Sequence, residues 1–207
     1  HGAYNSTNPY VGKVASYGMD LIGSSSTCWE FQHIMGHHPF TNLGSRTNEY
    51  ENDPDIFSSY PFVKMHPNDG KKAEWYMKYQ HFYALFLFAL FTMAKVAFGD
   101  FGYVKERKVA HLSMEARLSD PQVILRFVSF KIFTILAHVG VGIYFHGLWK
   151  GLALIAICHL VCGEFLALMF IVTHISEDCA FLDDEHKPEL VKTQKKVFNV
   201  FIIYTFK

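Results

Sequence analysis

The sequence predicts an all-α integral membrane protein. Half of its residues are hydrophobic, 20 are phenylalanine and only 18% are charged, which is more apolar than a typical water-soluble domain. Three long apolar stretches follow a more polar region, at residues 80–98, 127–145 and 151–173. With a rise of about 1.5 Å per residue, a helix of this length approaches or crosses a hydrocarbon core of about 30 Å.

Residues 1–79 are mixed in polarity and contain several turn sequences rich in proline, glycine, asparagine and serine. We expect loops and short helices in this region. Residues 11–22 fit an amphipathic helix, with Tyr17, Met19 and Leu21 near its apolar side. Such a helix is suited to lying at a membrane surface.

The placement of charge predicts the membrane topology. Basic residues precede and follow the 80–98 stretch: Lys64, Lys71, Lys72, Lys78, Lys105, Arg107, Lys108, Arg117 and Arg126. Both ends of this stretch are therefore expected in the cytosol, so that it is re-entrant or interfacial. Residues 127–145 and 151–173 are expected to form a transmembrane hairpin, and residues 174–207 to return to the cytosol and begin another segment. The reverse assignment, in which 80–98 spans and 127–145 is interfacial, leaves the later residues on the same side.

Ionisable side chains fall within the hairpin, among them Lys131, His138, His159 and Glu164. Lys131 lies near the start of the first helix, from where it can extend its amine toward water. His138 lies deeper in the same stretch, and His159 and Glu164 in the next stretch are expected to face protein or water rather than lipid. Two such histidines raise a rival hypothesis, in which the two helices present them to a haem.

The most informative motif is an H-x-x-x-H-H cluster formed by His33, His37 and His38. On a helix, residues four apart share a face, so His33 and His37 can direct ring nitrogens at one metal ion. His38 is expected to point about 100° away, toward a second metal. Neutral imidazole is the commonest protein ligand for metals, so the cluster predicts a metal site rather than a polar surface turn.

Composition narrows the possible partners and covalent links. The formal net charge is zero, which gives no overall signal for a nucleic-acid partner. The four cysteines lack C-x-x-C spacing, and two of them lie in an apolar run. Neither a disulfide framework nor a cysteine-type zinc site is expected.

The order of these features resembles a membrane fatty acid desaturase, most closely the front-end (delta-5/delta-6 type) acyl desaturases that are fused to cytochrome b5. That family carries three histidine boxes, H-D-x-x-H, H-x-x-x-H-H and Q-x-x-H-H, around two irons. The middle box is complete here in His33, His37 and His38. Asp53 and Asp55 are similar to the aspartate-containing segment that follows it.

The resemblance implies two further iron ligands. His1, which precedes Gly-Ala-Tyr, is similar to the last histidine of the first box, and His174 to the single histidine that ends the last spanning helix. The rest of the first box is missing before His1, and no Q-x-x-H-H occurs before Lys207. We therefore expect residues 1–207 to be a partial desaturase domain that is inactive alone. The implied ligands are His33, His37, His38, His1 and His174.

The resemblance also implies an activity, an O2-dependent insertion of a cis double bond into a fatty acyl chain carried on CoA or phospholipid. Removing hydrogen from an unactivated methylene needs an oxidant that no side chain supplies, hence the two iron ions. Electrons are expected from cytochrome b5 and its reductase, in the endoplasmic reticulum membrane with the histidine boxes facing the cytosol. A di-iron lipid hydroxylase and a sphingolipid desaturase are alternatives with the same chemistry. A haem-binding or structural polytopic membrane protein is the alternative of another class.

Overall fold

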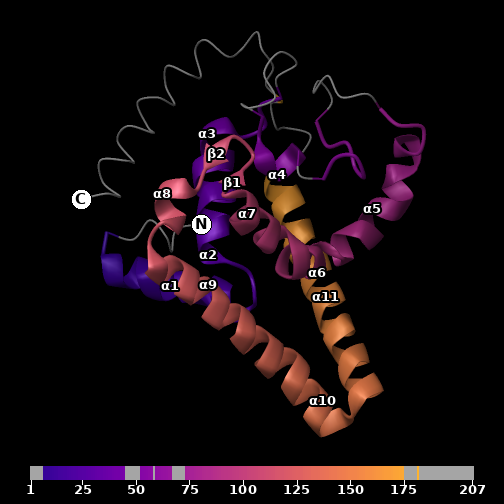
Figure 1. Ribbon diagram of the computed structural model, residues 1–207. Coiled ribbons are helices and arrows are strands. Elements are labelled where there is room, and N and C mark those ends of the chain that lie inside the picture. The colour runs from indigo at the N-terminus through magenta and orange to yellow at the C-terminus, as the bar shows by residue number, and fades with distance from the viewer. Residues whose placement is uncertain (1–6, 45–51, 58, 67–72, 175–180, 182–207) are drawn as a thin grey trace. The chain divides into compact units, whose positions relative to one another are not determined.

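The computed structural model describes residues 7–44, 52–57, 59–66, 73–174 and 181 (Figure 1). Most of these residues are helical, and the strands among them are β1 (Lys108–Val109) and β2 (Leu112–Ser113), which pair with each other. The chain divides into two units. Unit 1 comprises His1–Glu30, Leu85–Lys108 and Ser113–Met169, and unit 2 comprises Phe31–Ala84, Val109–Leu112 and Phe170–Lys207. The predicted helical class is confirmed.

Most helices are short. The elements before β1 are α1 (Pro9–Leu21), α2 (Ser26–Trp29), the π helix η1 (Glu30–His37), α3 (His38–Phe40), α4 (Pro54–Phe57), the 3-10 helix η3 (Met77–Tyr79), α5 (Gln80–Ala89), α6 (Phe91–Ala94), the π helix η4 (Lys95–Gly99) and α7 (Asp100–Glu106). Those after β2 are α8 (Glu115–Leu118), α9 (Pro121–Thr134), the π helix η5 (Ile135–Gly140), α10 (Val141–His146) and α11 (Leu148–His174).

Among the residues that the structure describes, two helical rods are long and apolar enough to cross a membrane, Pro121–His146 and Leu148–Val172. The first rod is α9, η5 and α10 in succession, and the second is α11 (Figure 1). Asp120 caps α9 by accepting a hydrogen bond from the backbone N–H of Gln122 at 2.9 Å, and a proline follows at the first helical position. The rods correspond to the predicted stretches 127–145 and 151–173, extended at the polar end of the first.

Glycines shape the connection between the rods. Gly147 has a φ of 73°, in the left-handed region that side chains with a Cβ rarely adopt. Four residues later, a Cβ on Gly151 would lie 2.7 Å from the carbonyl carbon of Gly142. The backbones of α10 and α11 therefore touch near the turn, and the hairpin depends on small residues at this point.

The predicted 80–98 stretch is broken in the structure. The segments Met77–Ala89 and Phe91–Glu106 would together pass as a third span, but they bend by 57° at the break. A bend of this size is compatible with a re-entrant segment. That this stretch stays on one side of the membrane remains a prediction.

Lys131 does not extend toward water as expected. Its side chain is buried, and its amine donates to the carbonyl oxygens of Gly23 at 2.6 Å and Val96 at 3.0 Å. It also donates to the buried carboxylate of Asp100 at 2.9 Å. A buried charge must be paired and hydrogen-bonded, and three acceptors within reach hold the amine inside unit 1. The stretches before α2 and after α6 are thereby tied to α9.

Candidate metal centre

The H-x-x-x-H-H cluster is built on a π helix rather than an α-helix. His33 and His37 belong to η1, and His38 begins α3. The hydrogen bonds of a π helix join residues five apart, so one turn holds more residues than a turn of α-helix. Residue i+5 therefore lies closer to the face of residue i than it does in an α-helix. This local widening decides where the three rings lie.

The three imidazole rings gather at one place. The rings of His33 and His37 are stacked, with centroids 4.9 Å apart and planes 11° from parallel. The His38 ring meets them edge-on, 4.9 Å from the His33 centroid and 5.7 Å from the His37 centroid. The expectation that His38 points away from the other two is wrong, because it assumed α-helical geometry. His33 and His37 are buried and His38 is exposed.

Each buried ring is held by a carboxylate. The Nδ1 of His33 lies 2.5 Å from Oδ2 of Asp55, and the Nδ1 of His37 lies 2.8 Å from Oδ2 of Asp53. Asp53 is fully buried, whereas 19% of the Asp55 side chain is exposed. A distance of 2.5 Å leaves no room for an ion between the two atoms, so a metal would be bound through the other ring nitrogen, Nε2. Carboxylates commonly orient metal-binding histidines in this way.

The carboxylates are themselves fixed by neighbouring groups. Asp53 accepts hydrogen bonds from the backbone N–H groups of Asn42 and Asp55, both at 2.9 Å. Asp55 accepts a bond from the side-chain amide of Gln32 at 2.8 Å. Gly36 allows η1 to approach α4 this closely, since a Cβ there would lie 2.6 Å from Cγ of Pro54. The rigid support of Asp53 and Asp55 fixes both rings.

The electrostatics of the cluster favour a bound cation. Burial lowers the pKa of His37, but the hydrogen bond and charge of Asp53, together with the charge of Asp55, outweigh burial and raise it. Burial raises the pKa of Asp55, yet the hydrogen bond from His33 and the nearby histidine charges hold it below its ordinary value. A carboxylate removed from water needs positive charge beside it, and a metal ion or an imidazolium provides it.

Among the described residues, one group has the composition and spacing of a metal site. His33, His37 and Asp55 each offer a ligand atom, and these atoms lie within 4.8 Å of one another. Imidazole nitrogens supported by carboxylates suit iron as well as zinc or copper. The residues present therefore fit the iron that the sequence analysis anticipated, with His38 at the exposed edge of the group.

Comparison with curated proteins finds relatives along most of the chain. The acyl-lipid (8-3)-desaturase of Physcomitrium patens is 30% identical over 187 residues, which cover 87% of this chain and 36% of that protein. Delta(5) fatty acid desaturase A of Dictyostelium discoideum is 25% identical over 184 residues, covering 87% of this chain and 37% of that protein. The chain belongs to the fatty acid desaturase family. Fatty acid desaturases are oxidoreductases.

The similarity extends to a third, more distant desaturase. The sn-1 linoleoyl-lipid 6-desaturase of Arthrospira platensis is 24% identical over 188 residues, which cover 90% of this chain and 48% of that protein. The chain thus spans 36 to 48% of the length of these three desaturases. No protein-family model and no solved structure matches the chain.

The structure describes the side chain of neither outer ligand that the sequence predicts, His1 and His174. His1 lies outside the described residues. His174 is the last residue of α11, and its side chain is not among those described. Four residues earlier on the same helix, the Phe170 ring lies 6.0 Å from the His33 ring. The end of α11 therefore reaches the histidine cluster, whereas the ligand roles of His1 and His174 remain predictions.

The pair behind the haem hypothesis lies together in unit 1. The rings of His138 and His159 have centroids 6.2 Å apart and contact each other edge-on. His138 lies one helical turn before Gly142, and His159 lies about two turns after Gly151. The two helices thus bring together the histidines of the haem hypothesis, which stays a prediction.

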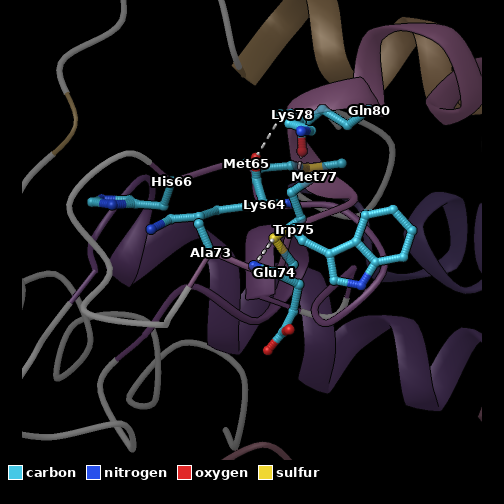
Figure 2. Close-up of a pocket in the computed structure, with 9 residues that line it drawn as sticks. All are labelled: Lys64, Met65, His66, Ala73, Glu74, Trp75, Met77, Lys78 and Gln80. Carbon is cyan, nitrogen blue, oxygen red and sulfur yellow. Dashed lines mark hydrogen bonds between the residues drawn. The ribbon is translucent and has the colours of Figure 1, made fainter.

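A cavity in unit 2 is lined by residues of the segments 64–66 and 73–80 (Figure 2). It has a volume of about 540 Å³, and none of His33, His37 and His38 lines it. Gln80 closes one side by pairing with the backbone N–H and carbonyl of Lys64, both at 3.1 Å. Its lining mixes basic, acidic, aromatic and thioether side chains without a group of metal ligands.

The sequence analysis missed two supporting residues, Gln32 and Gly36. A glycine inside a metal-binding helical motif is a signal of close backbone approach, and Gly36 could have been identified on that ground. The role of Gln32 had no such signal, because its partner Asp55 lies on another element.

Proposed function

We propose that the protein to which this chain belongs inserts a cis double bond into a fatty acyl chain, using O2 and a histidine-bound di-iron centre. The observation that carries the proposal is the pair of buried, stacked rings of His33 and His37, each held by a carboxylate through Nδ1. Family membership supports the reaction class, since relatives named as acyl-lipid desaturases match 87% of the chain.

The residues of the chain prepare the site for the metal. Iron bound by nitrogen ligands supplies an oxidant derived from O2, which an unactivated methylene requires. Asp53 and Asp55 hold the proton of each histidine on Nδ1, direct Nε2 toward the metal and make that nitrogen more basic. The π-helical turn places His38 beside them. His1 and His174 complete the proposed ligands from this chain.

The finer assignments follow the family resemblance. The reaction is of the front-end type, the acyl group is carried on phospholipid or CoA, and cytochrome b5 with its reductase delivers the electrons. The histidine boxes face the cytosol at the endoplasmic reticulum membrane. The basic residues around the 80–98 stretch support that orientation, because positive charge accumulates on the cytosolic side.

Expression of the intact protein in a host that lacks the product tests the proposal. Gas chromatography of the fatty acids should show a new unsaturated product with the wild-type protein and none with His37→Ala. His146→Ala, which changes an exposed histidine at the end of α10, is the matched control and should keep the product. A hydroxylated product would favour the hydroxylase alternative. Unchanged lipids with both wild type and variant, despite normal expression, would contradict the proposal.

A further inference from the structure

Helix α1 turns its polar side inward and its apolar side outward. Ser16 and Asp20 are buried, with 9% and 3% of their surface exposed. At about 100° per residue, they lie roughly opposite the exposed apolar residues of the same helix. A helix on the surface of a water-soluble domain has the reverse arrangement. The outward apolar residues are Tyr10, Val11, Val14 and Leu21.

Two basic residues of α9 fix α1 in this orientation. The guanidinium of Arg126 forms an ion pair with the carboxylate of Asp20 and donates to Oγ of Ser16 at 2.7 Å. Lys131 donates to the carbonyl oxygen of Gly23, just beyond the end of α1. Because these bonds lie on the inward side and at the end of α1, the helix cannot roll to bury its apolar face.

The position of Arg126 on α9 determines the depth at which α1 lies relative to the membrane. The rod Pro121–His146 has 26 residues, which at about 1.5 Å each extend about 39 Å, or about 9 Å more than the hydrocarbon core. The predicted apolar stretch begins at Phe127, directly after Arg126. The excess is therefore placed at the start of α9, where a charged residue lies at the level of the lipid headgroups. A helix bonded to Arg126 lies at the same level.

We propose that α1 is an interfacial anchor, whose outward face inserts into lipid at the headgroup and acyl-chain boundary of the membrane that α9 enters. The neighbouring α9 also exposes apolar side chains on its first turns, Leu125 and Val128. The outward face of α1 is a strip about 20 Å long and 10 Å wide, or about 200 Å², far below the roughly 800 Å² per partner of a stable protein interface. Lipid is thus a better occupant than a second copy of the chain.

Spin labelling of the intact protein in phosphatidylcholine vesicles, with any reactive cysteine outside residues 1–207 changed to alanine, tests this proposal. A nitroxide is attached at Val14→Cys, and its collision rates with oxygen, which enters lipid, and with a nickel chelate, which stays in water, are measured. Cys158, Cys162 and Cys179 are changed to alanine. Cys28 is kept, because burial and the charge of Asp100 raise the pKa of its thiol to about 11 and leave it unreactive at neutral pH.

Two reference positions calibrate the measurement. Glu115→Cys reports an exposed site outside the spans, and Leu136→Cys an exposed site in the middle of a rod. The label at position 14 should collide several-fold less often with the nickel chelate than the label at 115, and at a depth between the two references. Equal nickel collisions at 14 and 115 would overturn the proposal. So would protection from both reagents, or dipolar coupling between two copies, since either shows a protein partner.

The clamp on α1 is tested separately. Arg126→Gln should increase the mobility of the label at position 14 and its nickel collisions, because Asp20 and Ser16 lose their partner. Arg107→Gln is the matched control, since its ion pair with Glu115 is half-exposed on both sides, and it should change neither quantity. An unchanged label in Arg126→Gln would contradict the role of the clamp. None of these measurements depends on desaturase activity.

Discussion

Asp53 and Asp55 serve the histidine cluster in two ways. They fix the rotation of the His33 and His37 rings through Nδ1, and they place two carboxylates beside the proposed metal site. The resemblance drew attention to this pair of aspartates but assigned them no contact with the histidines. Their contacts could not be predicted, because His33 and Asp55 are 22 residues apart and no local pattern reports such a bond.

Asp55→Asn should weaken metal binding by the intact protein roughly 10- to 100-fold, since an amide holds the His33 ring without the charge that makes it basic. Competition with a chelator of known affinity measures the change. Asp120→Asn, at the exposed N-cap of α9, is the matched control and should leave the affinity unchanged, because asparagine caps a helix as well as aspartate does. Equal affinities for wild type and Asp55→Asn would contradict the supporting role of this carboxylate.

At the scale of elements, hydropathy predicted the long helices and missed the π helix. The rods Pro121–His146 and Leu148–Val172 are visible in sequence, because a run of apolar residues is a local property. Helix η1 was expected to be α-helical. Helix η1 contacts Asp53 and α4, which come later in the chain. Sequence periodicity alone could therefore not reveal its π-helical geometry.

Gly36→Ala tests the close approach of η1 and α4. The added Cβ would meet Cγ of Pro54 at 2.6 Å, so we expect the two elements to separate, Asp55 to lose its bond with His33, and metal affinity to fall. Gly18→Ala is the matched control in α1, where nothing lies within 4 Å of the new Cβ. It should stabilise the protein by about 0.5–1 kcal/mol, as alanine does in a helix. Chelator competition and thermal unfolding measure the two effects, and unaltered affinity in Gly36→Ala would contradict the packing account.

For the whole molecule, composition and hydropathy were enough to predict a helical membrane protein, and the histidine motif was enough to suggest the family. The inward polar side of α1 was beyond sequence reasoning, because Asp20 and its partner Arg126 are 106 residues apart. Sequence patterns relate residues that are neighbours along the chain. They therefore do not give the positions of His1 and His174 relative to the cluster. The topology therefore has to be measured directly.

Side-specific labelling tests the topology. Trp75 and Glu115 flank the 80–98 stretch, and Trp149 lies at the hairpin turn; all three are exposed. With cysteine at each position in turn, an impermeant maleimide should label positions 75 and 115 from one side and 149 from the other. Labelling of 75 and 115 from opposite sides would show that residues 80–98 span the membrane. With the hairpin also spanning, His174 would then lie across the membrane from His33, and the ligand assignment would fail.

The most direct test of the metal centre is the iron content of the purified intact protein, measured by mass spectrometry as iron atoms per polypeptide. The account predicts that the wild-type protein and His146→Ala contain iron, whereas His33→Ala and His37→Ala lose it while remaining folded by circular dichroism. Iron retained in full by His33→Ala and His37→Ala would contradict the claim that this cluster holds the metal.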